Sequence, residues 1–386
     1  MRRTGLLMLR SCLSWGHRGP YTTHATPAFV SNHQSMVVKC FRPSSRQPNL
    51  ETPSLNNSVR ALSSSSTSSF EAPEPPKSQG QPVFPDIQFR SSSSEEEHVA
   101  TNRNADPEAV FVVNGSNRGI GLQFVTSLLE RTKGKIIACC RSPSTAHDLK
   151  KIASKYPDER IQILSLDLEH QSSIDALASN IAQNHRRVDA LFNVAGILGD
   201  GTTTPGPERS LANIERDWME KTMAVNVIGP TMLTKALSPL MRTTGRRSVK
   251  MNVKLKGSGE EDSYNPLDID LPADRSPTVI VNLSARVGSI SDNGLGGWYS
   301  YRISKAALNQ STRTMGLELK RQGTWIVALH PGTTDTGLSK PFQRNVKAAR
   351  LFPVEFTVDR LLDVVESVGD QNTGGFYDWA GKALPF

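Results

Sequence analysis

The sequence predicts an α/β fold in which a doubly wound, mainly parallel sheet of seven strands carries helices on both faces. Seven short apolar runs rich in β-branched residues are spaced along residues 107–386, and amphipathic stretches lie between most of them. Strands that are apolar along their whole length are typical of parallel sheets buried on both faces. The runs are Val110–Val113, Ile136–Cys140, Ile161–Leu166, Val188–Val194, Val279–Leu283, Trp325–His330 and Phe376–Trp379.

The stretches between these runs have the spacing of apolar residues that is typical of surface helices. The expected helices are Leu122–Arg131, Ser172–Asn184, Leu211–Met241, Ser304–Arg321 and Val358–Val368. One stretch breaks the alternation, because Lys250–Ser276 is polar and contains Gly, Asp and Pro. We expect this insert to form a surface loop.

The chain before residue 107 has the composition of segments that do not fold on their own. Within residues 66–106, serines run at 91–94 and prolines cluster at 73–76. Such a segment cannot bury enough apolar surface to offset the entropy that is lost on ordering. We interpret residues 66–106 as a low-complexity linker that follows a disordered presequence.

Residues 1–65 have the composition of a cleaved transit peptide. Residues 1–50 contain no Asp or Glu, while Arg and Ser are frequent, as in organelle import signals. Leu6–Leu9 with Arg10 can form a short basic amphipathic helix, and Val59–Ser63 resembles a mitochondrial processing site. We predict import into the mitochondrion. A plastid address, whose signals are also rich in Ser and poor in acid, and a disordered tail without an address stay open.

The net charge is unevenly distributed along the chain, so each part has to be considered separately before the charge indicates a class of partner. The formal charge is +8, but residues 1–70 hold eight of the 45 Lys and Arg and one of the 37 Asp and Glu. The rest carries 37 basic and 36 acidic residues, so it gives no reason to expect a nucleic-acid partner. No stretch approaches the ~20 consecutive apolar residues that span a bilayer, and we expect no membrane span.

The four cysteines predict neither a disulfide framework nor a metal site. Cys139 and Cys140 are adjacent in an apolar run, and the other two cysteines lie before residue 50. Adjacent cysteines rarely bridge each other, and no ligand spacing for a metal is present. We interpret the pair as core packing in a protein of a reducing compartment.

The first predicted strand runs directly into a glycine-rich turn and then into a helix. Gly115, Gly119 and Gly121 give the spacing G-x-x-x-G-x-G. Glycine lets the backbone approach a pyrophosphate closely, at the positive end of the following helix. The pattern predicts a Rossmann-type nucleotide site, against the alternative of a plain βα turn. The other predicted contacts within the turn are Asn117, Arg118 and Ile120.

The end of the second predicted strand indicates which nicotinamide cofactor is bound. An NAD site needs an acidic residue there, but the chain reads Cys139-Cys140-Arg141-Ser142. Arg141 and Arg118 can instead pair with a 2′-phosphate through charge-assisted hydrogen bonds, which favours NADPH. Asp167, followed by Leu168, is placed to contact the adenine, although a helix N-cap explains Asp167 almost as well.

Tyr301 and Lys305 are spaced to share one face of a helix. An unperturbed tyrosine has a pKa of about 10, too high for efficient proton exchange near neutrality. A nearby ammonium stabilises the phenolate and lowers that pKa. Ser284, at the end of the fifth predicted strand, can donate a hydrogen bond to a substrate carbonyl oxygen. Together these residues predict a catalytic site that follows the glycine turn in the chain.

These motifs, in this order, resemble those of the short-chain dehydrogenase/reductase family over residues 107–386. Within that family the chain is most similar to the sniffer-like and C-factor-like carbonyl reductases, for example in Gly296–Arg302 and in the C-terminal Gly375–Gly381. The matching residues beyond those named above are Asn193, Ala195 and Gly196 after the fourth strand, Asn226 in the following helix, and Pro331, Gly332, Thr334 and Thr336 after the sixth strand.

The resemblance implies an NADPH-dependent oxidoreductase that reduces a small-molecule carbonyl compound. Tyr301 would give a proton to the carbonyl oxygen, and Ser284 would hold that oxygen. Lys305 would lower the Tyr301 pKa and hold the nicotinamide ribose, and Asn226 would position a water that links Lys305 to solvent. The resemblance also implies a homodimer formed through helices near 211–241 and 304–321.

Three residue patterns depart from the family. Asn114 stands where the glycine turn usually opens with Thr, Val194 replaces an Asn, and Ser284 lies 17 residues before Tyr301, further than usual. The neighbouring Tyr299 has Ile303, not Lys, four residues later. An NAD-dependent alcohol dehydrogenase and a nucleotide-binding signalling module without turnover stay open as alternatives.

The substrate pocket is expected in three loops. These are Ile197–Pro207, Arg286–Trp298 and Thr333–Val346. Within them, Leu295, Trp298 and Phe342 point to an apolar carbonyl compound, although each also fits a place in the core. The identity of the substrate is not readable from the sequence.

The presequence hypothesis makes a direct prediction. The mature protein should begin near residue 65, because the Arg-rich, acid-free segment is removed on import. Sequencing the N-terminus of the protein isolated from its cells measures this, and a fluorescent fusion of residues 1–90 distinguishes mitochondrion from plastid. A mature N-terminus near residue 1 would contradict cleavage.

Overall fold

The computed structural model describes residues 84–89 and 97–386, apart from 200–206 and 255–263. The predicted transit peptide, residues 1–65, lies wholly outside these ranges, and so does most of the predicted linker.

All seven predicted apolar runs form strands of one sheet, and every neighbouring pair is parallel. Across the sheet the strands are β3 (Ile161–Ser165), β2 (Lys135–Cys140), β1 (Val110–Asn114), β4 (Ala190–Asn193), β7 (Thr278–Leu283), β8 (Thr324–His330) and β11 (Gly375–Asp378). The chain winds outward from β1 in one direction and from β4 in the other. The carboxyl ends of β1 and β4 therefore mark the switch point, where such sheets bind their ligands.

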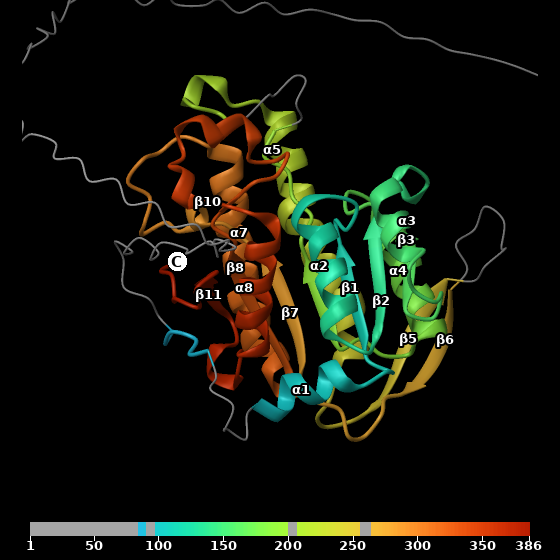
Figure 1. Cartoon of the computed structure of the whole chain (residues 1–386). Helices are drawn as coiled ribbons and strands as arrows, with labels where there is room; N and C mark the ends of the chain where they lie inside the picture. Colours follow the sequence, from blue (N-terminus) through green and yellow to red (C-terminus); the bar gives the residue numbers. More distant parts are fainter. Residues whose placement is uncertain (1–83, 90–96, 200–206, 255–263) are drawn as a thin grey trace, which may run out of the picture. The chain divides into compact units, whose positions relative to one another are not determined.

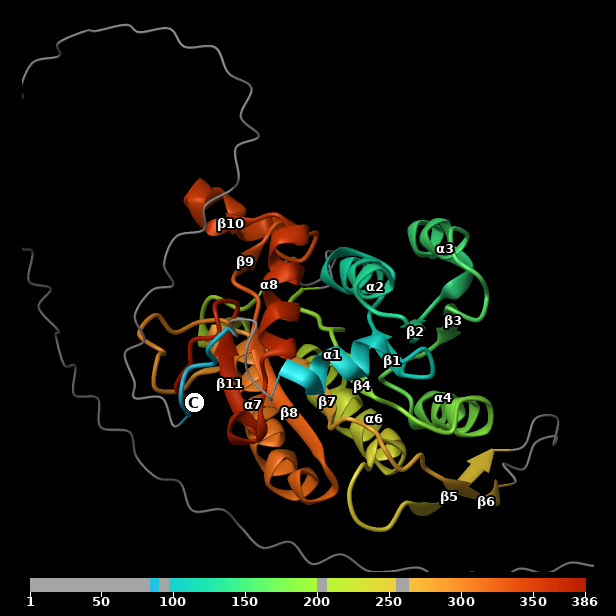
Figure 2. The same cartoon turned by 60° about the horizontal axis from the view of Figure 1, so that its bottom comes forward.

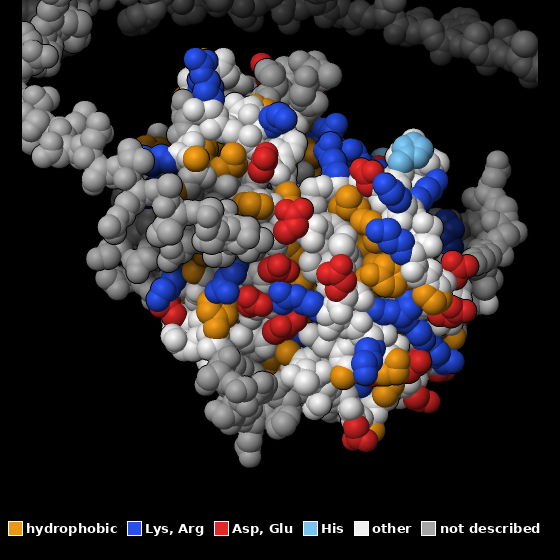
Figure 3. Space-filling model, in the orientation of Figure 1, with side chains coloured by type: hydrophobic (Ala, Val, Ile, Leu, Met, Phe, Trp, Pro, Cys, Tyr) orange, Lys and Arg blue, Asp and Glu red, His pale blue; other side chains and the backbone are white. Residues whose placement is uncertain are grey.

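Helices cover both faces of the sheet, as the fold class requires (Figures 1 and 2). One face is covered by α2 (Gly119–Arg131), α3 (His147–Ala153) and α8 (Val354–Glu366), and the other by α4 (Gln171–Asn184), α6 (Gly229–Leu237) and α7 (Tyr299–Leu319). On the face that carries α2 and α8, acidic and basic side chains are interspersed (Figure 3), and Arg131 of α2 pairs with Asp363 of α8 at 3.0 Å.

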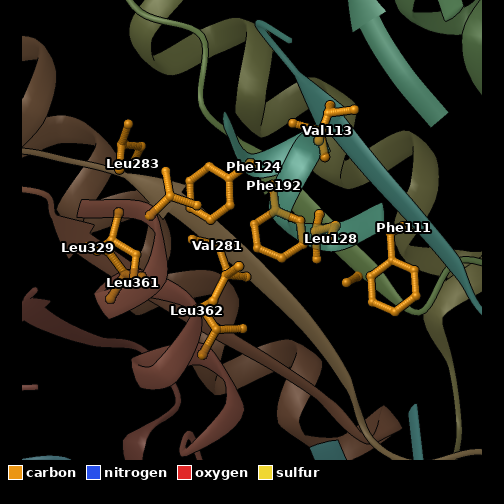
Figure 4. Close-up of a cluster of buried hydrophobic side chains, with 14 of the residues drawn as sticks. Phe111, Val113, Phe124, Leu128, Phe192, Val281, Leu283, Leu329, Leu361 and Leu362 are labelled. Carbon is orange, nitrogen blue, oxygen red and sulfur yellow. The ribbon is translucent and has the colours of Figure 1, made fainter. Parts of the chain in front are cut away.

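The two layers of core follow from the alternation of side chains along each strand. In β1, Phe111 and Val113 face α2 and α8, while Val110 and Val112 face the opposite layer. Figure 4 shows Phe124 of α2 beside Phe192 of β4, and their ring centroids are 5.1 Å apart. Truncating one such buried ring to Ala typically costs about 3–5 kcal/mol, so this layer holds the carboxyl ends of the central strands in place.

The helical stretch predicted over 211–241 is divided by a wider turn. It comprises α5 (Arg216–Met223), a π-helical turn (Ala224–Ile228) and α6. Gly229 directly follows the π turn, and a β-carbon there would lie 2.5 Å from Leu168. The helix therefore passes too close to the loop after β3 for a larger residue. Such turns often mark functional sites, and this one carries Asn226.

The prediction that Lys250–Ser276 forms a surface loop was wrong. The strands β5 (Ser248–Lys254) and β6 (Tyr264–Asp270) form an antiparallel hairpin in this part of the chain, and its tip lies outside the described residues. Met251, Val253 and Ile269 are buried in the core layer of α4 and α6. Apolar and polar residues alternate in Met251-Asn252-Val253, which is the period of a half-buried strand, but the run is too short to be distinctive.

Two parts of the segment predicted as a linker belong to the fold. Helix α1 (Glu97–Ala105) precedes β1 and buries Ala100. Residues 84–89, which we call the N-terminal strap, lie against the C-terminal loop, because the Ile87 N–H donates to the Gly381 carbonyl at 2.8 Å. The few apolar residues of this polar segment pack against distant parts of the chain, and composition alone does not reveal such packing.

If the strap is part of the cooperative fold, shortening its buried side chain should destabilise the whole domain. Ile87 is 4% exposed, so Ile87→Ala should lower the free energy of unfolding by about 2 kcal/mol or more. The control is Ile290→Ala, since Ile290 is 78% exposed and should change stability by no more than ~0.5 kcal/mol. Urea unfolding of both variants measures this. If Ile87→Ala unfolds at the same urea midpoint as the wild type, the strap is not part of the cooperative fold.

Candidate active site

A cavity of about 810 Å³ opens at the carboxyl ends of the central strands, at the switch point. Nearly all of the residues predicted for the site line it. They are Gly115, Asn117, Arg118, Gly119, Ile120, Gly121, Arg141, Asp167, Leu168, Ala195, Gly196, Ser284, Tyr301, Lys305, Pro331, Gly332, Thr334 and Thr336. Asn193 and Asn226 do not line the cavity and lie behind its wall.

The glycine turn closes tightly against its surroundings. Gly115 has φ 71°, and a β-carbon there would lie 2.8 Å from the backbone of Ala195. A β-carbon on Gly121 would lie 2.1 Å from the Gly115 carbonyl oxygen. The turn therefore brings the start of α2 directly to the cavity, where the unpaired N–H groups of the first helical turn can bind an anion.

Buried side-chain amides form a ladder across the carboxyl ends of β1, β4 and β7. Asn114, Asn193 and Asn282 are register partners on these strands. Asn114 donates to Asn193 at 2.6 Å, and Asn193 donates to Asn282 at 2.8 Å. Asn282 then donates to Thr312 of α7 at 2.8 Å. We call these four residues the amide ladder. It ties α7 to the strand that carries the glycine turn.

Asn114 also shapes the wall of the cavity. Its Oδ1 accepts hydrogen bonds from the N–H groups of Val194 and Ala195, at 3.0 and 2.9 Å. Asn114 therefore holds the loop after β4, where Val194 has no polar side chain to do so.

The predicted phosphate-selecting arginines lie at the rim. Arg118 is exposed, and the side chain of Arg141 is 64% exposed. No acid stands near Arg141 at the end of β2 in the sequence, but Glu169 lies 3.9 Å from its guanidinium. Asp167 accepts from the Glu169 N–H at 3.0 Å and is not the N-cap of α4, which is His170. Glu169 was missed because the loop after β3 approaches the end of β2 only in the folded sheet.

Tyr301 and Lys305 extend from the first turns of α7, as predicted. The Lys305 ammonium lies 5.6 Å from the centre of the Tyr301 ring and donates to the Leu283 carbonyl at 2.8 Å. Asn226 accepts from the Ile197 N–H at 2.8 Å and donates to Ser304 at 3.1 Å. A β-carbon on Gly196 would meet both Asn226 Oδ1, at 3.3 Å, and Lys305 Nζ, at 3.5 Å. Gly196, in the loop after β4, thus lies close to both side chains, and a larger residue there would crowd them.

Ser284 continues from β7 into the cavity wall. Its hydroxyl donates to Oδ1 of Asn309 on α7 at 2.6 Å. Asn309 was not among the predicted site residues. Because it follows Tyr301 by eight positions and Lys305 by four, helical spacing places all three on one face, and this signal could have identified it.

Burial controls the acid–base properties of the pair. It raises the pKa of Tyr301 above its ordinary value and lowers the pKa of Lys305 to about 8. The expected lowering of the Tyr301 pKa by Lys305 is therefore not the dominant effect in the cavity. The reason is desolvation, which penalises the phenolate and the ammonium alike when both are removed from water.

An aromatic wall stands beside Tyr301. The Trp298 ring lies 6.3 Å from that of Tyr301 and 5.0 Å from that of Phe342, between ring centroids. Trp298 has φ 56°, a left-handed conformation, and it is the N-cap residue of α7, with its N–H bonded to the Glu208 carbonyl at 2.5 Å. The expectation that Leu295 helps to line the pocket was wrong, since it is 94% exposed and lies in a turn that projects into solvent.

The buried Glu208 was not predicted from the sequence. Its carboxylate accepts hydrogen bonds from the N–H and the hydroxyl of Ser300, in the first turn of α7. A carboxylate at a helix N-terminus is stabilised by the helix dipole. Glu208 therefore fixes the start of the helix that carries Tyr301.

The described residues show no metal centre and no membrane span. They contain no cluster of His, Cys, Asp and Glu suited to a metal ion. No helix in the described ranges is long and apolar enough to cross a membrane.

A family model described as short chain dehydrogenase matches residues 109–251 and 269–347, more than half of the chain. The protein belongs to the short-chain dehydrogenase family. It is thus a short-chain oxidoreductase, and the unmatched residues 252–268 fall within the β5–β6 hairpin.

Relatives of this short-chain dehydrogenase include an uncharacterized oxidoreductase of Schizosaccharomyces pombe, 25% identical over 293 residues, which span 73% of this chain and all of the relative. The C-signal protein of Myxococcus xanthus is 27% identical, over 55% of this chain and 99% of its own.

Similar solved structures include an NADPH-bound carbonyl reductase from chicken fatty liver, with 28% identity and a TM-score of 0.58. Carbonyl reductase Sniffer of D. melanogaster has 26% identity and a TM-score of 0.57. Each comparison covers 72% of this chain and 99% of the other. The predicted sniffer-like resemblance is confirmed.

The low pKa of Lys305 predicts how stability depends on pH. A folded-state pKa of about 8, against an ordinary 10.5, means that the folded protein binds this proton less tightly than the unfolded chain. Wild-type stability should therefore rise between about pH 8 and 10.5, by at most about 3 kcal/mol, and Lys305→Met should lack this rise. Urea unfolding without cofactor measures the difference between the two proteins. The free energy of unfolding of Lys305→Met minus that of the wild type should therefore fall from about pH 7 to about pH 10. A difference that stays constant over this range would contradict the low pKa.

Proposed function

We propose that the protein reduces a small carbonyl compound with NADPH, with Tyr301 as the proton donor. One observation carries the proposal. Ser284, Tyr301 and Lys305 line the same cavity as the glycine turn, and the cavity is large enough for a cofactor and a small substrate. The solved carbonyl reductases with similar folds support the same reaction class.

The residues of the cavity fit a dinucleotide phosphate. Gly119 has φ 54°, and a β-carbon there would find no atom nearer than Thr336 at 3.5 Å, which leaves room at the start of α2 for a pyrophosphate. Arg118 and Arg141 lie at the rim, where they can pair with a 2′-phosphate. Pro331, Gly332, Thr334 and Thr336, from the loop after β8, would hold the nicotinamide end.

In the proposed reaction, NADPH supplies the hydride. Tyr301 gives its phenolic proton to the carbonyl oxygen as negative charge develops there, and Ser284 donates a hydrogen bond to the same oxygen. Lys305 would hold the nicotinamide ribose and reprotonate Tyr301, and Asn226 would fix the loop through which a water reaches Lys305.

The raised pKa of Tyr301 is compatible with a role as proton donor. Burial keeps the phenol protonated, and reduction requires that form. Measured turnover would exclude a binding module without activity, and the cofactor used and the direction of that turnover would distinguish a carbonyl reductase from an NAD-dependent alcohol dehydrogenase.

Removing the phenolic oxygen should abolish most turnover while leaving the cofactor in place. Tyr301→Phe should lower kcat by ~100-fold or more, the usual scale for a positioned acid, with NADPH affinity nearly unchanged. The assay is the loss of NADPH absorbance with a panel of aldehydes, ketones and quinones. Fluorescence titration gives the affinity.

Tyr299→Phe is the matched control. Tyr299 lies two positions away on the same helix but does not line the cavity, so its variant should resemble the wild type. An inactive Tyr299→Phe beside an active Tyr301→Phe would refute the assignment of the proton donor. A wild type that reduces no carbonyl compound with either cofactor would refute the proposed function.

Cofactor selection is tested separately. Arg141→Asp should weaken NADPH by about 10- to 150-fold, the scale of a hydrogen bond to a charged group, and should affect NADH much less. Arg216→Asp, on the exposed surface of α5, controls for the change of net charge. Unchanged NADPH affinity in Arg141→Asp would mean that the 2′-phosphate binds elsewhere.

A further inference from the structure

A buried amide stands directly behind Ser284. Asn309 is 2% exposed, lies on the same face of α7 as Tyr301 and Lys305, and does not line the cavity. Within the described residues its side chain makes one hydrogen bond, the 2.6 Å contact in which Ser284 donates to Oδ1. Within the described residues, hydrogen bonding therefore links the Asn309 side chain to the proposed catalytic groups only through Ser284.

That hydrogen bond conflicts with the role of Ser284 in the reaction. A serine hydroxyl has one proton, and in the structure this proton is directed at Asn309 Oδ1, away from the cavity. A hydroxyl that stabilises a carbonyl oxygen has to direct the same proton into the cavity. Ser284 cannot do both at once.

The other end of the amide resolves the conflict. Among the described residues, Nδ2 of Asn309 is buried without a hydrogen-bond partner. A half-turn of the side-chain amide exchanges Oδ1 and Nδ2 in nearly the same space. Nδ2 then donates to Ser284 Oγ, the buried N–H group gains a partner, and the hydroxyl proton is released toward the cavity. A buried carbonyl without a partner is better tolerated than a buried N–H.

We propose that Asn309 is a positioning residue whose amide turns the single proton of Ser284 toward the carbonyl oxygen of the substrate. Without substrate, Asn309 accepts from Ser284. With substrate, Asn309 donates to Ser284, and Ser284 donates to the substrate. Asparagine suits this place because its amide both accepts and donates, whereas a carboxylate of the same shape only accepts. This inference rests on the proposed function, since it requires Ser284 to act on a carbonyl.

Two substitutions distinguish the loss of the hydrogen-bond donor of Asn309 from the loss of its whole amide. Asn309→Asp keeps the shape and the acceptor but removes the donor, so a carboxylate would hold the Ser284 proton away from the substrate. Asn309→Leu removes both and leaves the hydroxyl free to rotate. We expect kcat for a reducible probe such as para-nitrobenzaldehyde to fall by ~50-fold in Asn309→Asp and ~10-fold in Asn309→Leu, within the range for a hydrogen bond to a charged group. NADPH affinity should stay within about two-fold in both variants.

The pH profile supplies a readout that a merely structural role would not change. Protonation of the introduced carboxylate restores a donor, so the activity of Asn309→Asp relative to wild type should rise as the pH falls. Gln310→Glu is the matched control, because it makes the same change of amide to carboxylate on the exposed side of α7. Its relative activity should not depend on pH. If Asn309→Asp does not fold, the test rests on Asn309→Leu.

A double variant shows whether Asn309 acts through Ser284. In Ser284→Ala the hydroxyl is absent, so adding Asn309→Leu should cost no further activity. If Ser284→Ala slows the reaction but both Asn309 variants turn over like wild type, or if the two losses multiply, the inference is overturned and the proposed function stands. If Ser284→Ala itself has wild-type activity, the proposed role of Ser284 fails, and this inference fails with it.

Discussion

The amide ladder is the constraint on which the site depends. Asn114, Asn193, Asn282 and Thr312 are almost completely buried, and a buried amide without a partner costs about 1–3 kcal/mol. Each member is satisfied only if its neighbour sits in one register. A slip of any of the three strands by one residue would leave several polar groups unpaired at once. The ladder therefore aligns the carboxyl ends of β1, β4 and β7, from which the site's loops emerge.

Strand β7 connects this alignment to the chemistry. Asn282 pairs with Thr312 on α7, and the next residue, Leu283, accepts the hydrogen bond of the Lys305 ammonium. Ser284 follows and bonds to Asn309 of the same helix. Three consecutive residues, the last two of β7 and the one that follows it, thus fix a helix at three successive turns. The positions of Tyr301 and of the glycine turn are set by a single continuous network.

The sequence predicted most of the structural features that are set by residues close together in the chain. It predicted few of those that depend on contacts between residues far apart in the chain. The seven strands were readable because each is a short, mainly apolar run, and the glycine turn because its spacing is local. The hairpin was missed because its apolar alternation covers few residues, and the strap because it folds only against the C-terminal loop. In the site, Glu169 and Glu208 could not be predicted, since each acquires its role from a partner far along the chain. Asn309 was within reach, because helical periodicity places it beside Lys305.

The N-terminal strap has a consequence for the connectivity of the domain. The ring of Phe84, the first described residue, lies 6.3 Å from that of Phe386, the last residue of the chain, between ring centroids. The N-terminal strap and the C-terminal residue therefore lie side by side, and a short peptide could join them. Domains with adjacent ends tolerate circular permutation. New termini could then open between β5 and β6, which pair outside the seven-stranded sheet, so its strand neighbours would stay the same.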